Sequence, residues 1–315
     1  MPSPGFGVFV EYTSTALSLF CLPINVMFVI MVLRESRHPI LGTPFFRLCI
    51  HLSIADILMA VVSLVLFKMP IFGWLPDSIF TESWAVIPIA CINYFGHAQA
   101  IGIIFIAFNR FTAVYYPIKH KQCWWKPGAT AILMLVQWTL PCLMVLPLFF
   151  TKFTFVTDHL TGSVSVTASD PIVHKAYFIG VAFVDGVIVN IIVSALYIGI
   201  FTRVRSHVVV RRPEQLVARL ALSAFVIFIS YLALGIFSVL SALAPPNETW
   251  TYSYRTVWFV VNDVLCASNA PVLLALNRPI RRLFLSRLGF ESKSRVCREI
   301  KESQPLDLAP SITNL

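Results

Sequence analysis

Charged residues are scarce in this chain of 315 residues, because Asp, Glu, Lys and Arg together make up only 12% of it. A soluble domain usually contains about 25% charged residues. Hydrophobic residues account for 57% of the sequence. This composition excludes an ordinary water-soluble fold, so we expect lipid to be the solvent for most of the chain.

Cysteine is also missing from the places where a secreted protein uses it. None of the seven cysteines lies in an expected outer loop, so the sequence predicts no disulfide framework. Clusters of His and acidic residues that would suit a metal ion are lacking too, because His97 is the only histidine deep in an apolar run. We therefore expect no metal and no cofactor.

Long apolar runs are what the sequence does contain. Seven of them have 21 or more residues, which is long enough to cross about 30 Å of hydrocarbon as a helix and too long for a strand of a membrane barrel. We predict an all-α membrane protein with a seven-transmembrane helix bundle. The expected spans are residues 12–33, 45–67, 86–108, 129–150, 176–201, 216–244 and 256–276.

The basic residues predict the orientation of these spans. With the N-terminus outside, 20 of the 24 Lys and Arg residues fall on the inner side, and Lys68 is one of four assigned to outer segments. We expect a multi-pass protein of the plasma membrane, with the C-terminus in the cytoplasm. The net charge of +9 then forms an inner rim against anionic lipid, which makes lipid an expected partner and nucleic acid not one.

The segments outside the spans are short. We expect an extracellular N-terminus over 1–11, a seven-transmembrane domain over 12–277, an amphipathic helix on the inner surface over 278–290 and a disordered cytoplasmic tail over 291–315. Pro279 marks the start of the amphipathic helix. In the second outer loop, TGSVSVTAS predicts either a hairpin or an irregular lid.

The stretch FNRFTAVYYPIKHKQCWW, residues 108–125, places Arg110 at the inner end of the third span and Pro117 seven residues later. An arginine there can simply anchor its helix by reaching the headgroups. It can also exchange partners when the inner ends of a bundle separate. Asn25 in PINVMFV and Asp56 in LSIADILMA favour the second interpretation, because they recur at the order and spacing of a known superfamily.

That superfamily is the rhodopsin-like G-protein-coupled receptors, whose Asp-Arg-Tyr motif resembles the Asn-Arg-Phe at residues 109–111. Within it, NRFTAVYYPIKHKQCW looks most like the nematode serpentine chemoreceptors of the class gamma and class V group. The resemblance implies a chemosensory receptor, not an enzyme, that binds a small-molecule or peptide signal from outside and activates a heterotrimeric G protein. It also implies sensory cilia as a candidate location.

The resemblance also implies roles for individual residues. The residues implied in G-protein coupling and activation are Asn109, Arg110, Pro117, Tyr197 and Glu214, and those implied in a core polar network are Asn25, Asp56, Asn269 and Pro271. The chain departs from the superfamily in several places. Asn109 replaces an acid, Leu274 stands where a tyrosine is expected, and the sixth span lacks the Cys-Trp-x-Pro hinge.

Acids inside a membrane are costly, so Asp185 and Asp263 need partners or a function. They lie in the outer halves of the fifth and seventh spans, where receptors of this shape bind ligands; the alternative is hydrogen bonding between helices. We predict a ligand site between spans three, five, six and seven, with Asp263 as an unpaired carboxylate. The predicted polar contacts are Tyr94, His97, Asp185, Asn262 and Asp263.

Other functions remain open at this point. A seven-span transporter or intramembrane enzyme is one alternative, although the sequence has no internal repeat of the kind that many transporters show. A receptor-like protein that no longer signals is another. Asn247 begins a glycosylation sequon in the third outer loop and is a candidate for modification.

Overall fold

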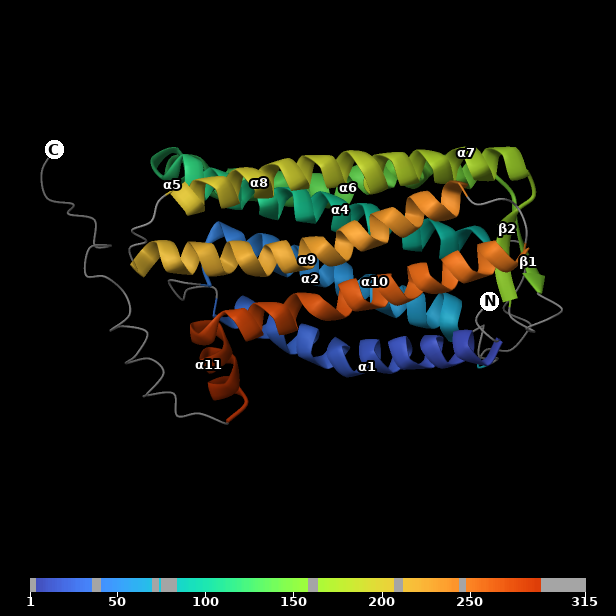
Figure 1. Cartoon of the computed structure of the whole chain (residues 1–315), viewed down its shortest axis with the longest axis horizontal. Coiled ribbons are helices and arrows are strands. Elements are labelled where there is room, and N and C mark those ends of the chain that lie inside the picture. The colour runs from blue at the N-terminus through green and yellow to red at the C-terminus, as the bar shows by residue number, and fades with distance from the viewer. Residues whose placement is uncertain are drawn as a thin grey trace, which may run out of the picture.

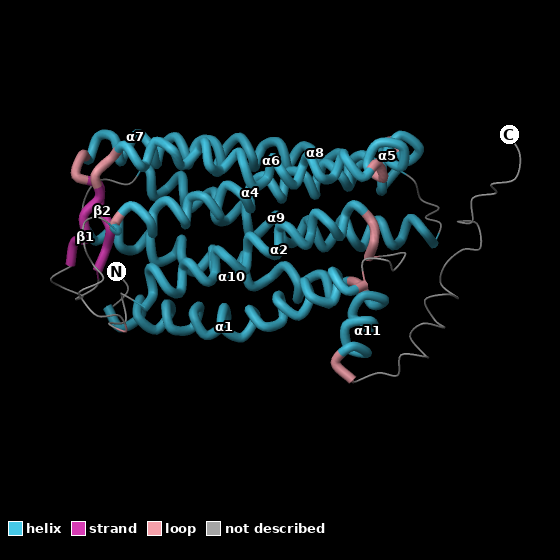
Figure 2. The backbone as a smooth tube through the Cα atoms, turned by 180° about the vertical axis from the view of Figure 1, so that it is seen from behind, coloured by secondary structure: helices cyan, strands magenta, loops and turns pink. Residues whose placement is uncertain are grey.

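The computed structural model describes residues 4–35, 41–69, 74, 84–157, 164–206, 212–243 and 248–289. In these ranges the long helices lie side by side in an elongated bundle, with two strands at one end and the short helices α5 and α11 at the other (Figure 1). Figure 2 shows the same arrangement from behind.

The described chain passes along the bundle seven times. The passes are α1 (Pro4–Arg34); α2 (Pro44–Ser63) continued by the π-helix η1 (Leu64–Lys68); α4 (Val86–Tyr115); α6 (Pro127–Val145) continued by the 3-10 helix η4 (Leu146–Phe150); α7 (Pro171–Val181), the π-helix η5 (Ala182–Val189) and α8 (Asn190–Ser206); α9 (Arg212–Leu243); and α10 (Glu248–Leu276). Helices α5 (Pro117–Trp124) and α11 (Arg278–Arg287) are the short ones.

Six of the described passes are long and apolar enough to cross a membrane, and α9 adds a shorter apolar stretch at Ala224–Leu240. The prediction of an all-α membrane protein with a seven-helix bundle is therefore confirmed.

Prolines begin several of these helices. Pro44, Pro117, Pro127 and Pro279 each lie in the first turn of a helix. The missing N–H of proline costs nothing there, because a first-turn N–H has no partner within the helix. Pro279 thus lies in the first turn of α11, at the helix start that the sequence predicts.

The loop predicted to be the second outer one is a hairpin, the first of the two predicted alternatives. Strand β1 (Phe153–Thr157) pairs antiparallel with β2 (Val164–Ala168), with Phe153 opposite Ala168. Phe153 is buried in a small apolar cluster with Ile89 of α4 and Leu148 of η4. The hairpin is thereby fixed to the outer ends of these two passes.

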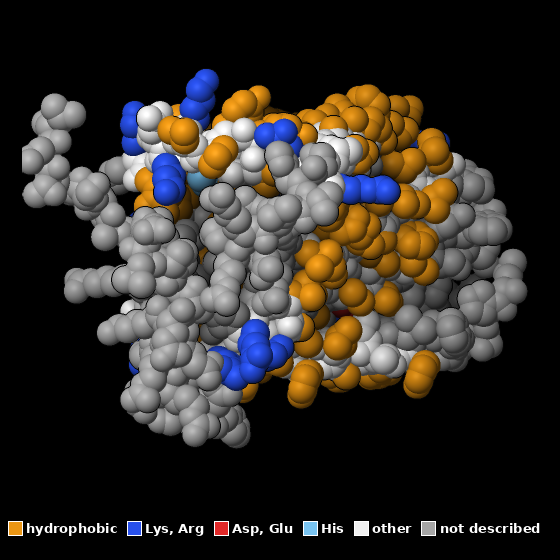
Figure 3. Space-filling model, turned by 60° about the vertical axis from the view of Figure 1, so that its left-hand side comes forward, with side chains coloured by type: hydrophobic (Ala, Val, Ile, Leu, Met, Phe, Trp, Pro, Cys, Tyr) orange, Lys and Arg blue, Asp and Glu red, His pale blue; other side chains and the backbone are white. Residues whose placement is uncertain are grey.

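The largest apolar cluster lies in the half of the bundle next to α5 and α11, the predicted inner half, and includes Phe28, Phe45, Phe46, Leu48, Tyr197 and Leu273. Other large apolar side chains face outward. Ile132, Leu143, Ile191 and Ile198 are each more than 60% exposed, as a surface against lipid requires. Figure 3 shows this apolar surface, with Lys and Arg side chains around the end of the bundle that comes forward.

One basic residue that the sequence analysis placed in an outer segment is buried. Lys68 is the last residue of η1 and of the membrane-length pass and is 5% exposed. Asn247 and the predicted tail 291–315 lie outside the described residues. Glu214 belongs to α9, but its side chain is not in the described part.

Candidate functional site

Asp56 of α2 lies at the centre of a buried polar network. Gln99 of α4 donates a hydrogen bond of 2.7 Å to its Oδ1 atom, and Asn269 of α10 donates one of 3.0 Å to its Oδ2 atom. Asn269 also donates to the hydroxyl oxygen of Ser53 at 3.0 Å. A buried carboxylate inside a membrane requires such donors. Three passes are therefore joined at one acid.

Asn25 of α1 joins the same region through the backbone of α10. Its amide nitrogen donates to the carbonyl of Cys266 at 3.0 Å, and its amide oxygen accepts from the N–H of Ala270 at 3.2 Å. In a regular α-helix that carbonyl and that N–H would bond to each other. Asn25 thus bonds a backbone carbonyl and a backbone N–H that lie one helical turn apart in α10, just before Pro271. It does this rather than bonding Asp56.

Arg110 is buried at the inner end of α4, where it is 6% exposed. Its Nη2 atom donates to the Oδ1 atom of Asn109 at 2.9 Å. The guanidinium carbon lies 3.8 Å from the ring centre of Phe45 on α2. The described partners of this cation are thus a neutral amide and an aromatic ring, which hold it without cancelling its charge.

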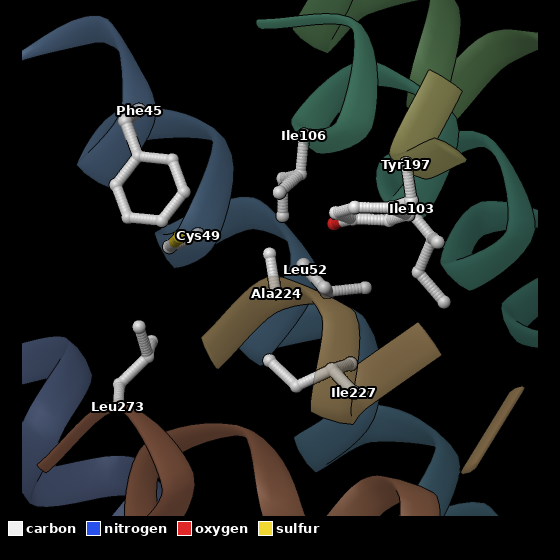
Figure 4. Close-up of a pocket in the computed structure, with 9 residues that line it drawn as sticks. All are labelled: Phe45, Cys49, Leu52, Ile103, Ile106, Tyr197, Ala224, Ile227 and Leu273. Atoms are coloured by element: carbon white, nitrogen blue, oxygen red, sulfur yellow. The ribbon is translucent and has the colours of Figure 1, made fainter. Parts of the chain in front are cut away.

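An apolar cavity lies next to Phe45, where five helices meet (Figure 4). Its walls come from α2 (Phe45, Cys49, Leu52), α4 (Ile103, Ile106), α8 (Tyr197), α9 (Ala224, Ile227) and α10 (Leu273). The ring of Tyr197 points into it in Figure 4 and stacks on Phe228 with a centroid distance of 5.6 Å. The cavity is a small packing defect between α8 and α9 on one side and α2 and α4 on the other.

Helix α5, which begins at Pro117, packs against the inner end of α4. His120 Nδ1 lies 3.1 Å from the hydroxyl of Thr112, and Trp124 is buried against Phe108 with a centroid distance of 5.9 Å. Burial lowers the pKa of His120 to about 4, and the charge of Arg110 adds to this effect. His120 is therefore neutral at physiological pH.

Two sequence-predicted ligand residues meet in the outer half of the bundle. His97 of α4 lies with its Nδ1 atom 2.6 Å from the Oδ2 atom of Asp185 in η5. Tyr231 of α9 donates to the backbone carbonyl of Asp185 at 3.3 Å, and Asn190 donates to the same carbonyl at 3.3 Å. His97 Nε2 is buried without a hydrogen-bond partner in the described residues.

The π-helical geometry of η5 accompanies a close crossing with α9. A Cβ atom on Gly186 would lie 2.9 Å from the carbonyl oxygen of Gly235, and one on Gly235 would lie 2.3 Å from Asn190 Nδ2. Both glycines are needed because side chains would separate the two backbones. π-Helical turns within longer helices occur frequently at functional sites.

Asp263 lies elsewhere in the outer half and has a partner of its own. Lys68 donates to its Oδ2 atom, so the expectation of an unpaired Asp263 carboxylate was wrong. The lysine is the last residue of η1, one residue beyond the predicted end of the second span. This ion pair borders a second cavity between α1, the second pass and α10.

The remaining two predicted ligand residues lie apart from these pairs. The hydroxyl of Tyr94 donates to the carbonyl of Trp138 on α6 at 2.8 Å, so this side chain faces the fourth pass. Asn262 is fully buried, and neither polar atom of its amide has a hydrogen-bond partner in the described residues. The five predicted contacts therefore do not gather around one point.

Sequence reasoning missed three members of these sites: Ser53, Gln99 as a partner of Asp56, and Lys68 as a partner of Asp263. Gln99 gave a usable signal, because an amide in an otherwise apolar span needs a partner. Lys68 gave a misleading one, since a lysine that follows an apolar run is typical of a membrane edge.

These features define a class of protein: a seven-helix membrane receptor of the G-protein-coupled kind, with a buried acid joining the second, third and seventh passes and an arginine at the inner end of the third. The sequence model described as "Serpentine type 7TM GPCR chemoreceptor Srv" matches residues 14–290. The chain belongs to this family of serpentine chemoreceptors, as the resemblance in spans two and three predicted.

Relatives agree with this assignment. The chain is 59% identical to Serpentine receptor class V-1 of Caenorhabditis elegans over 280 residues, which cover 89% of this chain and 90% of that protein. It is 25% identical to the Neuropeptide F receptor of Drosophila melanogaster over 82% of this chain and 58% of that receptor. It is also 25% identical to Dopamine receptor 3 of Caenorhabditis briggsae, over 39% of this chain and 20% of that receptor.

Proposed function

We propose that this protein is a plasma-membrane chemoreceptor that binds a signal from outside the cell and activates a heterotrimeric G protein on the inner side. One observation carries the proposal. In the described residues the charge of Arg110 is held by Asn109 and Phe45, neither of which neutralises it, beside a small apolar cavity between five helices. Such a charge is ready to exchange partners.

The inner side of the receptor acts as follows. In the closed bundle Arg110 remains on the ring of Phe45. When the inner ends of α8 and α9 move away from α4, Tyr197 repacks and Arg110 turns toward the G protein. Glu214, near the beginning of α9, acts as a further closed-state partner for Arg110. Pro117 supports the coupling surface because it begins α5 directly after α4.

The signal reaches the inner side through α10. Asp263 lies in the outer half of this helix, and Asn269 bonds Asp56 lower down. Asn25 bonds the backbone on either side of the turn before Pro271. A ligand that shifts the outer half of α10 therefore changes hydrogen bonds that join it to the first, second and third passes. The shift is a change of population between two arrangements.

The proposed ligand contacts lie at separate points of the outer half: the pair of His97 and Asp185, the amide of Asn262, and Asp263 beside Lys68, while Tyr94 belongs to the wall against α6. His97 Nε2 and the amide of Asn262 support this choice, because buried polar atoms without partners suit a hydrogen-bonding ligand. The ligand is a small molecule or a peptide; the two more distant relatives are named for a neuropeptide and for dopamine, respectively.

The orientation places the N-terminus outside and the C-terminus in the cytoplasm. It is supported by the basic residues of α5 and α11, which lie at the same end of the bundle (Figure 1). An epitope at the N-terminus should be labelled by antibody on intact cells, and an epitope at the C-terminus only after permeabilisation. Labelling in the opposite order would invert the proposed orientation.

A screen in transfected cells tests the proposal as a whole. Cells expressing the receptor are exposed to odorants and small secreted metabolites, with calcium and cyclic-nucleotide readouts. At least one compound should evoke a response in cells with the unchanged receptor and none in cells with Arg110→Ala. Lys126→Ala is the matched control, because Lys126 also lies on the inner side, next to the beginning of α6, and should leave the response intact.

The screen also addresses the alternative that the chain no longer signals, which Asn109 and Leu274 favour because both replace residues of the superfamily's switches. Silence across the panel at a normal surface level would support that alternative. A response that survives Arg110→Ala would leave Arg110 as a membrane anchor.

A further inference from the structure

Lys68 and Asp263 form a charge pair in the outer half of the bundle, where the exposed fractions of their side chains are 6% and 1%. They come from η1 and α10, which are separated by 195 residues in the sequence. Removing two charges from water is costly even when they pair, so the pair is a weak device for stability alone. Because the pair lines a cavity, it could instead contact a ligand.

The cavity combines an aliphatic wall with polar groups. It is lined by Thr15, Ser18, Leu19, Leu22, Ala60, Leu64, Lys68 and Asp263. The hydroxyl oxygen of Ser18 is buried and has no hydrogen-bond partner in the described residues. The lining of the cavity therefore offers a ligand one ammonium group, one carboxylate and one hydroxyl without a described hydrogen-bond partner.

The balance of charge restricts what can bind there. The lining residues carry one positive and one negative charge, which cancel. A ligand with a single charge would pair with one side chain and leave the other buried and unpaired, which is the costly arrangement in a low-dielectric site. A ligand with both charges leaves neither side chain alone.

We propose that this cavity binds a small zwitterion with one carboxylate, one ammonium group and an aliphatic body, of which a free aliphatic amino acid is the simplest example. The proposal rests on the receptor function proposed above. The ligand carboxylate accepts from the Lys68 ammonium and the Ser18 hydroxyl, and the ligand ammonium donates to Asp263. The aliphatic body packs on Leu19, Leu22 and Leu64.

Binding requires Lys68 and Asp263 to separate. The closed cavity has room for about one water molecule, although the atom-free space including its mouth is about 240 Å³. The ligand therefore replaces a direct ion pair by two pairs of its own and moves η1 away from α10. Asp263 lies eight residues before Pro271, which is about 12 Å along the helix, so this movement begins in the segment that leads to the Asn25 and Asp56 contacts.

Thermal unfolding of the full-length receptor in lipid nanodiscs measures this binding without a G protein. The probes are leucine, isoleucine and valine, each compared with its deaminated acid and its decarboxylated amine; for leucine these are 4-methylpentanoate and 3-methylbutylamine. At least one amino acid should raise the Tm in a concentration-dependent way. Its acid and its amine should bind at least about tenfold more weakly.

Single substitutions should change the preferred charge of the ligand. Lys68→Met leaves Asp263 alone and should favour the amine, whereas Asp263→Asn leaves Lys68 alone and should favour the acid. Both should weaken binding of the amino acid by about 100-fold. The exchanged pair, Lys68→Asp with Asp263→Lys, keeps both charges and should bind the amino acid within about tenfold of the unchanged receptor. Lys152→Met, in the exposed second outer loop, is the matched control and should change nothing.

Failure has distinct forms. The proposal is overturned if none of the amino acids shifts the Tm of the unchanged receptor, or if Lys68→Met and Asp263→Asn bind all three probe types as the unchanged receptor does. If no amino acid binds but another compound evokes signalling that depends on Arg110, the proposed binding site is rejected and the receptor function is not. Amino-acid binding without any G-protein activation supports the cavity and rejects the proposed signalling.

Discussion

The side-chain amide of Asn25 bonds to the backbone N–H of Ala270 at 3.2 Å, directly before Pro271, and to the carbonyl of Cys266 at 3.0 Å. A side chain of the first pass therefore bonds a carbonyl and an N–H that lie one helical turn apart in the seventh. Insertion of a side chain into the hydrogen-bond ladder is a recognised cause of helix bending. At this site it also makes α1 part of any movement of α10.

Asn25→Ala should destabilise the receptor, because it leaves the Cys266 carbonyl and the Ala270 N–H without their described side-chain partner. We expect a loss of about 1–3 kcal/mol, seen as a lower Tm in nanodiscs. Thr13→Ala is the control: its hydroxyl bonds within α1 at an exposed position, so its loss should leave the Tm almost unchanged. An unchanged Tm for Asn25→Ala would mean that α10 closes its own hydrogen bond there.

Gly186→Ala should disturb the crossing of η5 and α9. Its Cβ atom would lie 2.9 Å from the carbonyl oxygen of Gly235, and backbone cannot move aside as a flexible side chain can. We expect overpacking to cost about 1–3 kcal/mol and to reduce the amount of receptor at the cell surface, measured by flow cytometry. Gly180→Ala is a matched control in α7, because a Cβ atom there meets nothing within 4 Å. Equal surface levels for both variants would contradict the close crossing.

Asn109→Asp should lower the basal activity of the receptor. The carboxylate would replace a neutral acceptor of Arg110 by a charged one, and charge-assisted hydrogen bonds are about twice as strong. Arg110 would then stay longer in the closed arrangement. Basal G-protein activation at matched surface levels checks this, with Asn109→Ala expected to change it in the opposite direction. Higher basal activity for Asn109→Asp would show that Asn109 supports the active arrangement instead.

The stability of the inner end should depend on pH through His120. Burial lowers its pKa in the folded receptor to about 4, below the ordinary value of 6.5. As the pH falls from 6.5 toward 4, His120 binds a proton in the unfolded chain but stays neutral in the folded receptor. The contribution of His120 to stability is therefore full above pH 6.5 and is lost as the pH falls through this window. His120→Gln should show a smaller decrease in Tm between pH 6.5 and 5. Identical profiles would place His120 in solvent.

Much of the fold was predictable because membrane spans are set by long apolar runs, and prolines mark helix starts such as that of α5 at Pro117. The Asp56 region was predictable because a buried acid requires donors, although the bond from Asn25 goes to backbone. The pairs formed by Lys68 with Asp263 and by His97 with Asp185 were not predictable. Each pair joins passes that are distant in sequence. Which side chains meet depends on the rotation of each helix about its own axis and on the two π-helical stretches, η1 and η5. A pattern of apolar residues does not predict either feature.

Nucleotide exchange by purified components tests the central claim most directly. The receptor in nanodiscs is combined with purified heterotrimeric G proteins from each major Gα class, with and without the compounds active in cells. The unchanged receptor should accelerate exchange on at least one class, and Arg110→Ala should do no more than empty nanodiscs. No acceleration by the unchanged receptor, or equal acceleration by Arg110→Ala, would contradict the account.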